Sequence, residues 1–135
     1  PLTVMIVGEG SGYFLDSLDQ AKQLAVLHLS GDLRLYAGSY VGPGGSQTGK
    51  RVIVGVFSGP QSELHNNRHS PTVTGNPGNN GLGGVTVGNY AGLGPAFTLA
   101  GYIAEVAIWG RALSHDEIAG VNKYAADRYG LVVLP

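Results

Sequence analysis

Few side chains in this sequence have the types and spacing needed for acid–base or nucleophilic chemistry. Glu63, His65 and Ser70 can be drawn as acid, base and nucleophile, but no Gly-x-Ser-x-Gly motif surrounds the serine. Glu105 is the one carboxylate in a clear strand pattern, whereas glycanases need two carboxylates at the scissile bond. We therefore expect no enzymatic activity, and we expect Glu105 to accept hydrogen bonds from a neighbouring loop or from Arg111.

Histidines and oxygen-bearing side chains are weak candidates for metal binding. His65 and His69 are four residues apart, but the Asn and Pro residues around them indicate a turn rather than a helix. His28 alternates within an apolar strand and is expected to face solvent. Calcium takes oxygen ligands, which two clusters could supply: Asp16 with Asp19, and Asn76 with Asn79 and Asn80. Turn formation explains both clusters better, so we expect no cofactor, with calcium as the alternative.

Aromatic and amide side chains provide a better candidate for ligand binding. Sugar rings stack on exposed aromatic faces, and amides hold their hydroxyl groups. The residues that suit this role are Tyr36, Tyr40, Asn66, Asn67, Asn89 and Tyr90. The alternative is that the tyrosines cover the rim of the fold and the asparagines occupy left-handed turn positions. We expect Trp109 to lie in the core, on the same side of its strand as Ile103.

The composition limits the class of protein. Hydrophobic residues make up 43% of the chain, charged residues 13%, and 23 of 135 residues are glycine, which together predict short strands and tight turns. The formal net charge is −1, with both signs spread along the chain, so neither nucleic acid nor a membrane surface is an expected partner. No apolar run approaches the ~20 residues of a membrane span. The absence of cysteine excludes a disulfide framework.

Apolar runs and alternating patterns predict a series of strands that the final helix closes. The predicted strands are residues 2–7, 24–29, 33–37, 51–57, 63–65, 85–88 and 102–109. Glycines 8, 10 and 12 are expected to end the first strand in a turn. Residues 30–32 are expected to form a hairpin turn, and residues 91–100 an apolar loop over one end of the fold.

The last third of the chain carries the clearest helix signals. Ser114 and Glu117 have the spacing of a capping box, and Gly130 can stop the helix in a left-handed conformation. An apolar stripe with helical spacing lies between them: Ile118, Val121, Tyr124, Ala125 and Tyr129. The pattern predicts a short helix over about Ser114–Tyr129 that packs on the sheet.

The segments IAEVAIW, RALS and HDEIAGVNKYAADRYGL together resemble the carboxy-terminal signature of the concanavalin A-like, laminin-G-like jelly-roll superfamily. The segments LTVMIVG, LHLSGDLRLYAG and RVIVGVFSGPQSELHNN more loosely resemble earlier strands of that family. The resemblance implies one domain over residues 1–135, folded as an all-β, two-sheet antiparallel jelly-roll sandwich with one short C-terminal α-helix. In that family one or more strands precede the strand that starts here at Leu2, so we expect these opening strands to be missing.

The same resemblance implies a function. It indicates a non-catalytic carbohydrate-recognition or adhesion module of a larger extracellular, cell-surface or virion protein, such as a phage tail, fibre or capsid-decoration component. The expected partner is a glycan or another protein subunit, including further copies of this chain. The alternative is a purely structural subunit-contact domain in an assembly. A glycan-cleaving enzyme is the third and least favoured interpretation.

The capping box leads to a test. Ser114→Ala should lower the free energy of unfolding by about 1 kcal/mol, because the helix loses the hydroxyl that accepts from a free backbone amide. Thermal denaturation monitored by circular dichroism measures this change, and any binding activity should stay the same. An unchanged melting temperature would show that the capping assignment is wrong.

Overall fold

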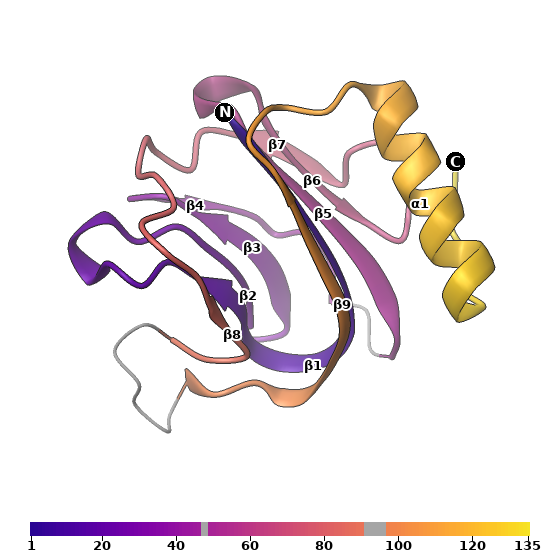
Figure 1. Cartoon of the computed structure of the whole chain (residues 1–135), viewed down its shortest axis with the longest axis horizontal. Helices are drawn as coiled ribbons and strands as arrows, with labels where there is room; N and C mark the ends of the chain where they lie inside the picture. Colours follow the sequence, from indigo (N-terminus) through magenta and orange to yellow (C-terminus); the bar gives the residue numbers. More distant parts are fainter. Residues whose placement is uncertain (47–48, 91–96) are drawn as a thin grey trace.

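The computed structural model describes residues 1–46, 49–90 and 97–135. Nine strands, two 3-10 turns and one helix follow in this order (Figure 1): β1 (Leu2–Asp16), η1 (Gln20–Lys22), β2 (Ala25–Leu29), β3 (Asp32–Tyr36), β4 (Tyr40–Val41), β5 (Arg51–Phe57), η2 (Gly59–Gln61), β6 (Ser62–Asn66), β7 (Val73–Gly75), β8 (Thr86–Val87), β9 (Ala100–Trp109) and α1 (His115–Tyr129). The prediction of an all-β chain with one C-terminal helix is confirmed. No helix among the described residues is long and apolar enough to cross a membrane.

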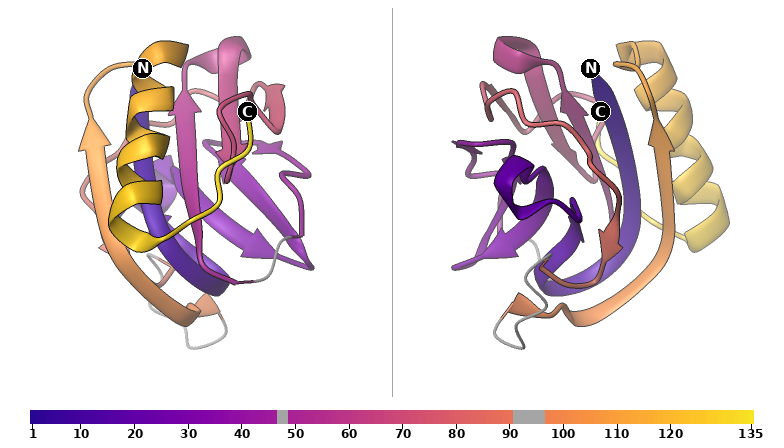
Figure 2. Two further views of the ribbon diagram at one scale, coloured as in Figure 1. Left: turned by 90° about the vertical axis from the view of Figure 1, so that its right-hand side faces the viewer. Right: turned by 60° about the vertical axis from the view of Figure 1, so that its left-hand side comes forward.

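The long strand β1 organises the sheet. Its first half pairs with β5 on one side and β9 on the other, and its second half pairs with β2 and β8. The remaining strands extend the order to β4-β3-β2-β1-β5-β6-β7, and the named strands all pair antiparallel. β1 bends sharply near its middle, so the half with β9, β5, β6 and β7 faces the half with β8, β2, β3 and β4 (Figures 1 and 2). The result is one continuous, nearly closed sheet.

The glycines that were expected to end the first strand lie inside β1, so the predicted turn is wrong. A Cβ added at Gly8, Gly10 or Gly12 would lie only 2.4–2.6 Å from carbonyl oxygens of residues 98–102. Gly10 and Gly12 also have φ angles of 136° and 110°, which favour glycine. Glycine lets the two backbones approach this closely while β1 bends, and the strand therefore continues to Asp16.

Three apolar clusters give the fold its layers. The main core lies between the two halves and contains Val4, Ile6, Phe14, Leu15, Leu24, Val26, Leu33, Leu35, Ala37, Val41, Ile53, Phe57 and Leu64. A second cluster lies under α1, where Met5, Val7 and the valines of β5 contact Leu113, Ile118 and Ala125. A third lies on the opposite side of the molecule, over the outer face of β1 and β2. The helix α1 thus covers one side of the molecule, and the outer face of β1 and β2 forms the other, which we call the strand side.

Most predicted strands are confirmed within one or two residues. In β3, Leu33 and Leu35 are buried while Arg34 and Tyr36 are half-buried, as the alternation predicts. Residues 30 and 31 have φ angles of 54° and 81° and form the two-residue turn between β2 and β3. The short strands β4 and β7 were not predicted. Two- and three-residue strands carry too little pattern to detect in the sequence.

The predicted helix is confirmed with both of its ends. The Ser114 hydroxyl accepts from the Glu117 amide, and a Glu117 carboxylate oxygen accepts from the Ser114 amide at 2.9 Å. Gly130 ends the helix with φ 64°. Ile118 and Ala125 are fully buried, whereas Tyr124 lies at the flank and is 44% exposed. The apolar stripe therefore packs on the outer face of the sheet, as expected.

A β-bulge in β9 changes which side chains face the core. The register with β1 shifts between Val7 and Gly8, because Ala104 is an extra residue in β9. Ile103 packs against the core between the halves, whereas Trp109 packs against the cluster under α1. The expectation that these two residues share a face is wrong, since one extra residue reverses the alternation.

The close contact between β1 and β9 can be tested with two glycine substitutions. A Cβ at Gly101 would lie 1.9 Å from the Glu9 carbonyl oxygen, so Gly101→Ala should destabilise the fold by at least about 2 kcal/mol. The control is Gly120→Ala in α1, where nothing lies within 4 Å. It should stabilise the fold by up to about 1 kcal/mol through helix propensity. Equal effects in urea denaturation would contradict the β1–β9 geometry.

Candidate functional site

The residues considered for calcium make hydrogen bonds within turns. The buried Asp16 accepts from the Ser17 amide at 2.8 Å and from the Gln23 side chain at 3.0 Å. Asp19 caps η1 by accepting from the Ala21 amide at 2.9 Å. In the part of the chain that the structure describes, no three His, Asp or Glu side chains are arranged to hold a metal ion. The hydrogen bonds account for both aspartates as turn-forming residues.

The asparagines of the 76–80 segment have similar roles. Asn76 accepts from the Gly78 amide at 3.0 Å, and the Asn80 amide group donates to the Gln23 carbonyl oxygen at 3.0 Å. Asn79 is exposed and lines a cavity of about 610 Å³ next to η2. Asn80 thus fastens this segment to the region of η1.

Two asparagines proposed for sugar binding are structural. Asn66 is 2% exposed, and its side chain donates to the Gly44 carbonyl oxygen at 3.0 Å. Asn67 has φ 52°, and its side chain accepts from the Val52 amide at 2.8 Å. Asn66 cannot contact a ligand at the surface, and Asn67 holds the end of β5. The left-handed Asn67 matches the alternative interpretation of the sequence, whereas Asn66 lies at the end of β6 and is not in a left-handed turn position.

The tyrosines of the predicted set do come together on one surface. The rings of Tyr36 and Tyr40 lie 4.8 Å apart between centroids, on neighbouring strands. The ring centroid of Tyr90 lies 5.3 Å from that of Tyr13, and the ring centroid of Phe97 lies 5.4 Å from that of Tyr90. Tyr36 and Tyr90 both pack on the cluster that contains Tyr13. We call these five residues the aromatic face. Asn89, which accepts from the Tyr90 amide at 2.8 Å, adjoins it.

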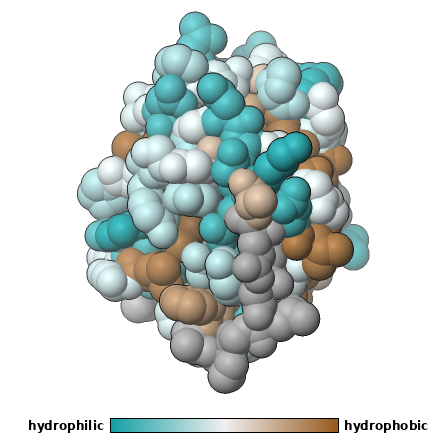
Figure 3. Space-filling view, turned by 90° about the vertical axis from the view of Figure 1, so that its left-hand side faces the viewer, coloured by the Kyte–Doolittle hydropathy of each residue, from teal (hydrophilic) through white to brown (hydrophobic). Residues whose placement is uncertain are grey.

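The central residue of the aromatic face is buried, and the residues at its edges are exposed. Tyr13 is 6% exposed, and burial raises the pKa of its hydroxyl to about 12. Tyr40 is 52% exposed and Phe97 is 41% exposed. Figure 3 shows the left-hand side of Figure 1, where hydrophilic and neutral residues dominate and hydrophobic residues form small groups. Ring surface is thus available to a ligand without a large continuous apolar patch.

Sequence reasoning missed two residues of the aromatic face, Tyr13 and Phe97, and the neighbouring Arg34. Tyr13 was overlooked because the glycines before it predicted a turn, although Tyr13, Phe14 and Leu15 continue a strand pattern. Phe97 falls within the predicted apolar loop, of which residues 91–96 lie outside the described part of the chain. The guanidinium carbon of Arg34 lies 5.7 Å from the centroid of the Tyr40 ring, and no motif in the sequence marks this residue.

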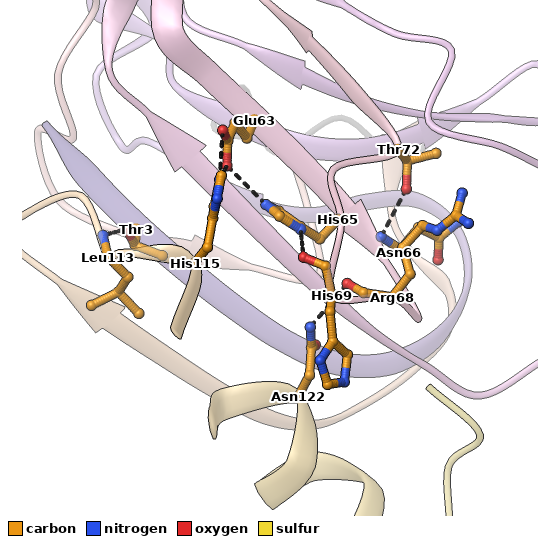
Figure 4. A network of polar contacts seen from close by, with 10 residues as sticks. All are labelled: Thr3, Glu63, His65, Asn66, Arg68, His69, Thr72, Leu113, His115 and Asn122. Atoms are coloured by element: carbon orange, nitrogen blue, oxygen red, sulfur yellow. Dashed lines mark hydrogen bonds and ion pairs between the residues drawn. The ribbon is translucent and has the colours of Figure 1, made fainter. Parts of the chain in front are cut away.

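A second polar cluster joins β6 to the start of α1 (Figure 4). Glu63 lies between two imidazoles, with His65 Nε2 at 3.1 Å and His115 Nε2 at 3.0 Å. The other ring nitrogen of the fully buried His65, Nδ1, lies 2.9 Å from the His69 carbonyl oxygen. A carbonyl oxygen only accepts, so Nδ1 carries the hydrogen. With the hydrogen on Nδ1, the contact between Nε2 and the Glu63 carboxylate is a hydrogen bond only when a second proton lies between these two groups.

This cluster borders an open cleft of about 630 Å³ that is also lined by Ser58, Thr74 and Ser114. The acid and base of the predicted triad therefore do meet, but the serine does not join them. Ser70 donates to the Pro135 carbonyl oxygen at 3.1 Å, and both His65 nitrogens have other partners. His69 reaches His65 through its backbone, which does not fit the shared metal site considered for the two histidines.

Glu105 has different partners from those predicted. Its carboxylate accepts from the Tyr124 and Tyr129 hydroxyls of α1 and lies 3.6 Å from Arg128. Arg111 instead pairs with Glu117, and this bond holds the pKa of the Glu117 carboxyl at about 2. The sequence could not show this, because helix residues more than a dozen positions away supply the partners.

His28 is 8% exposed, so the expectation that it faces solvent is wrong. It pairs with Leu33, a core residue, and therefore lies on the inner face of β2. Burial, followed by the charge of Arg51, lowers the pKa of its imidazole. Arg51 is itself buried and donates to the Gly10 carbonyl oxygen at 2.9 Å. Both residues line a cavity of about 230 Å³ at the bend of β1.

No protein-family model matches this sequence, and no curated protein matches it.

The burial of Tyr13 leads to a pH prediction. In the unfolded chain a tyrosine ionises near pH 10, whereas in the folded state the pKa of Tyr13 is about 12. The unfolded state therefore loses its proton first, and Tyr13 lowers stability as the pH rises from about 10 to 12. Urea denaturation at several pH values across this range should show a smaller decrease in the free energy of unfolding for Tyr13→Phe than for the wild type. Identical pH profiles would contradict the burial of this hydroxyl.

Proposed function

We propose that this chain is a non-catalytic carbohydrate-recognition module that binds its glycan on the aromatic face. The gathering of Tyr13, Tyr36, Tyr40, Tyr90 and Phe97 on one exposed surface supports the proposal. Pyranose rings have apolar faces that pack on aromatic rings, and their hydroxyls need hydrogen-bonding groups beside those rings.

The geometry of the two ring groups suits an extended ligand. Tyr36 and Tyr40 are tilted by 52°, so the two ring planes are not parallel and present surface in different directions. Tyr40 offers the largest exposed area of the set, at the short strand β4. The second group, around Tyr90, lies across the buried Ala25 and Leu27 of β2. A chain of several sugar units matches this spread of rings better than a single sugar.

The wider assignment belongs to the same proposal. We assign the fold to the concanavalin A-like, laminin-G-like superfamily as a two-sheet jelly roll, on the strength of the closing strand and helix. The two facing halves of the sheet are consistent with it. We further propose that the module serves adhesion in a larger extracellular, cell-surface or virion protein. Its work there would be binding, without cleavage of the glycan.

The exposed edge of β9 favours a second candidate function, subunit contact in an assembly. β9 has ten residues and pairs only with β1 among the described strands, whereas β4, β7 and β8 have two or three residues. Tyr102 and Ile108 on β9 are 43% and 39% exposed. A long, apolar edge strand can accept a strand from another chain, which short edges do not.

Glycan-array binding followed by calorimetry tests the first proposal. Tyr40→Ala and Tyr36→Ala should each weaken binding of the preferred glycan by about tenfold, because one stacked ring is lost. Tyr124→Ala is the matched control, since this exposed tyrosine lies on α1 at the other side of the molecule. It should leave affinity unchanged.

Two results would count against glycan recognition. An array without binding, together with a stable oligomer in solution that Ile108→Lys dissociates, would establish the subunit-contact function instead. Equal losses for Tyr40→Ala and Tyr124→Ala would show that the aromatic face is not the binding surface. Cleavage of any polysaccharide on the array would overturn both candidate functions.

A further inference from the structure

We infer that the glycan carries an anionic group, a carboxylate or a sulfate, which Arg34 binds beside the aromatic face. This inference rests on the proposed function and names the class of sugar. Arg34 lies on β3, which stands between β4 and β2 in the sheet, with its guanidinium carbon 5.7 Å from the Tyr40 centroid. A sugar stacked on Tyr40 would thus have a cation next to its substituents.

The position of the Arg34 side chain is set by its surroundings. On one side β2 places Leu27 directly opposite Arg34. On the other side the Arg34 stem lies against Gly42, where an added Cβ would come within 2.9 Å of Arg34 Cγ. The guanidinium is held over the Tyr40 ring in the geometry of a cation–π contact. Binding an anion here would therefore cost little side-chain ordering.

Among the described residues, the ion pair of Arg34 with Asp32 is a single contact, so Arg34 keeps most of its hydrogen-bonding capacity for a ligand. This contact joins Nη2 and Oδ2 at 3.8 Å, and both side chains are 33% exposed. By contrast, Arg111 holds Glu117 with both terminal nitrogens. A guanidinium has five N–H donors, and it binds planar anions best with two parallel hydrogen bonds. The loose Asp32 contact leaves room for that arrangement.

Uncharged sugars would not use this group to the same extent. Their hydroxyls can accept single hydrogen bonds, whereas a carboxylate or sulfate engages the guanidinium through two oxygens and also neutralises its charge. Asp32 is an acid close to the guanidinium and opposes a second anion, but both side chains are 33% exposed, so solvent and salt screen this repulsion. The attraction of an anion to Arg34 therefore outweighs its repulsion by Asp32, which favours an acidic sugar on this surface.

The test compares matched glycans on the intact chain. Each neutral oligosaccharide is paired with its uronic-acid form and with its sulfated form, and affinities are measured by calorimetry for wild type, Arg34→Gln, Arg34→Lys and Arg128→Gln. Arg128→Gln makes the same charge change at a 60% exposed side chain on α1. Wild type should prefer one anionic form by about tenfold over the neutral form. Arg34→Gln should remove this preference and weaken binding of the neutral form much less, because a sugar hydroxyl accepts only a single hydrogen bond from the guanidinium.

The variants separate charge from geometry. Arg34→Lys should keep only part of the preference, because an ammonium group cannot form the paired contact, and Arg128→Gln should keep all of it. Preference for the uronic acid over the sulfate, or the reverse, identifies the anion. Equal binding of neutral and anionic forms, or equal effects of Arg34→Gln and Arg128→Gln, overturns this inference and leaves glycan recognition standing. A wild type that binds no sugar overturns both.

Discussion

The close approach of β1 and β9 at the bend of β1 is the constraint on which the rest of the structure depends. Gly8, Gly10 and Gly12 let the two backbones meet where any side chain would collide with a carbonyl oxygen. Beyond the bend the same strand pairs with β2 and β8, so one chain segment holds both halves of the sheet in place. Phe14 and Leu15 then point into the core while Tyr13 supports the aromatic face.

The two sides of the molecule are stabilised in different ways. On the helix side, polar side chains fasten the last third of the chain: the Thr3 hydroxyl donates to the Arg111 carbonyl oxygen and accepts from the Leu113 amide. The buried Asn122 of α1 donates to the Arg68 carbonyl oxygen (Figure 4). On the strand side, the rings of Tyr13, Tyr36 and Tyr90 pack together with Ala25 and Leu27. At the edges of this aromatic face, Tyr40 and Phe97 remain exposed.

Local features of the sequence predicted much of this fold, while features that depend on distant contacts were missed. The helix was predictable because Ser114, Glu117 and Gly130 act within a turn of its ends. The run of glycines was misread because a turn and a close backbone approach use the same residue, and only β9 distinguishes them. The tyrosines were recognised by type, but Asn66 is buried and donates to the Gly44 carbonyl oxygen, a contact 22 residues away that the sequence does not reveal. The contact of Arg34 with the Tyr40 ring depends on the pairing of β3 with β4, which the sequence did not predict.

The pairing of β1 with β9 also has a consequence for how the chain reaches its folded state. Thr3 pairs with Trp109, and the tail at Leu134 returns to the segment at Asn67, so many contacts join residues far apart in the sequence. Such non-local topology slows folding, since long loops must close before the contacts form. During synthesis β1 emerges long before its partner, with one edge open. We therefore expect the sheet to close only after β9 has been synthesised, so that folding of these residues is completed late.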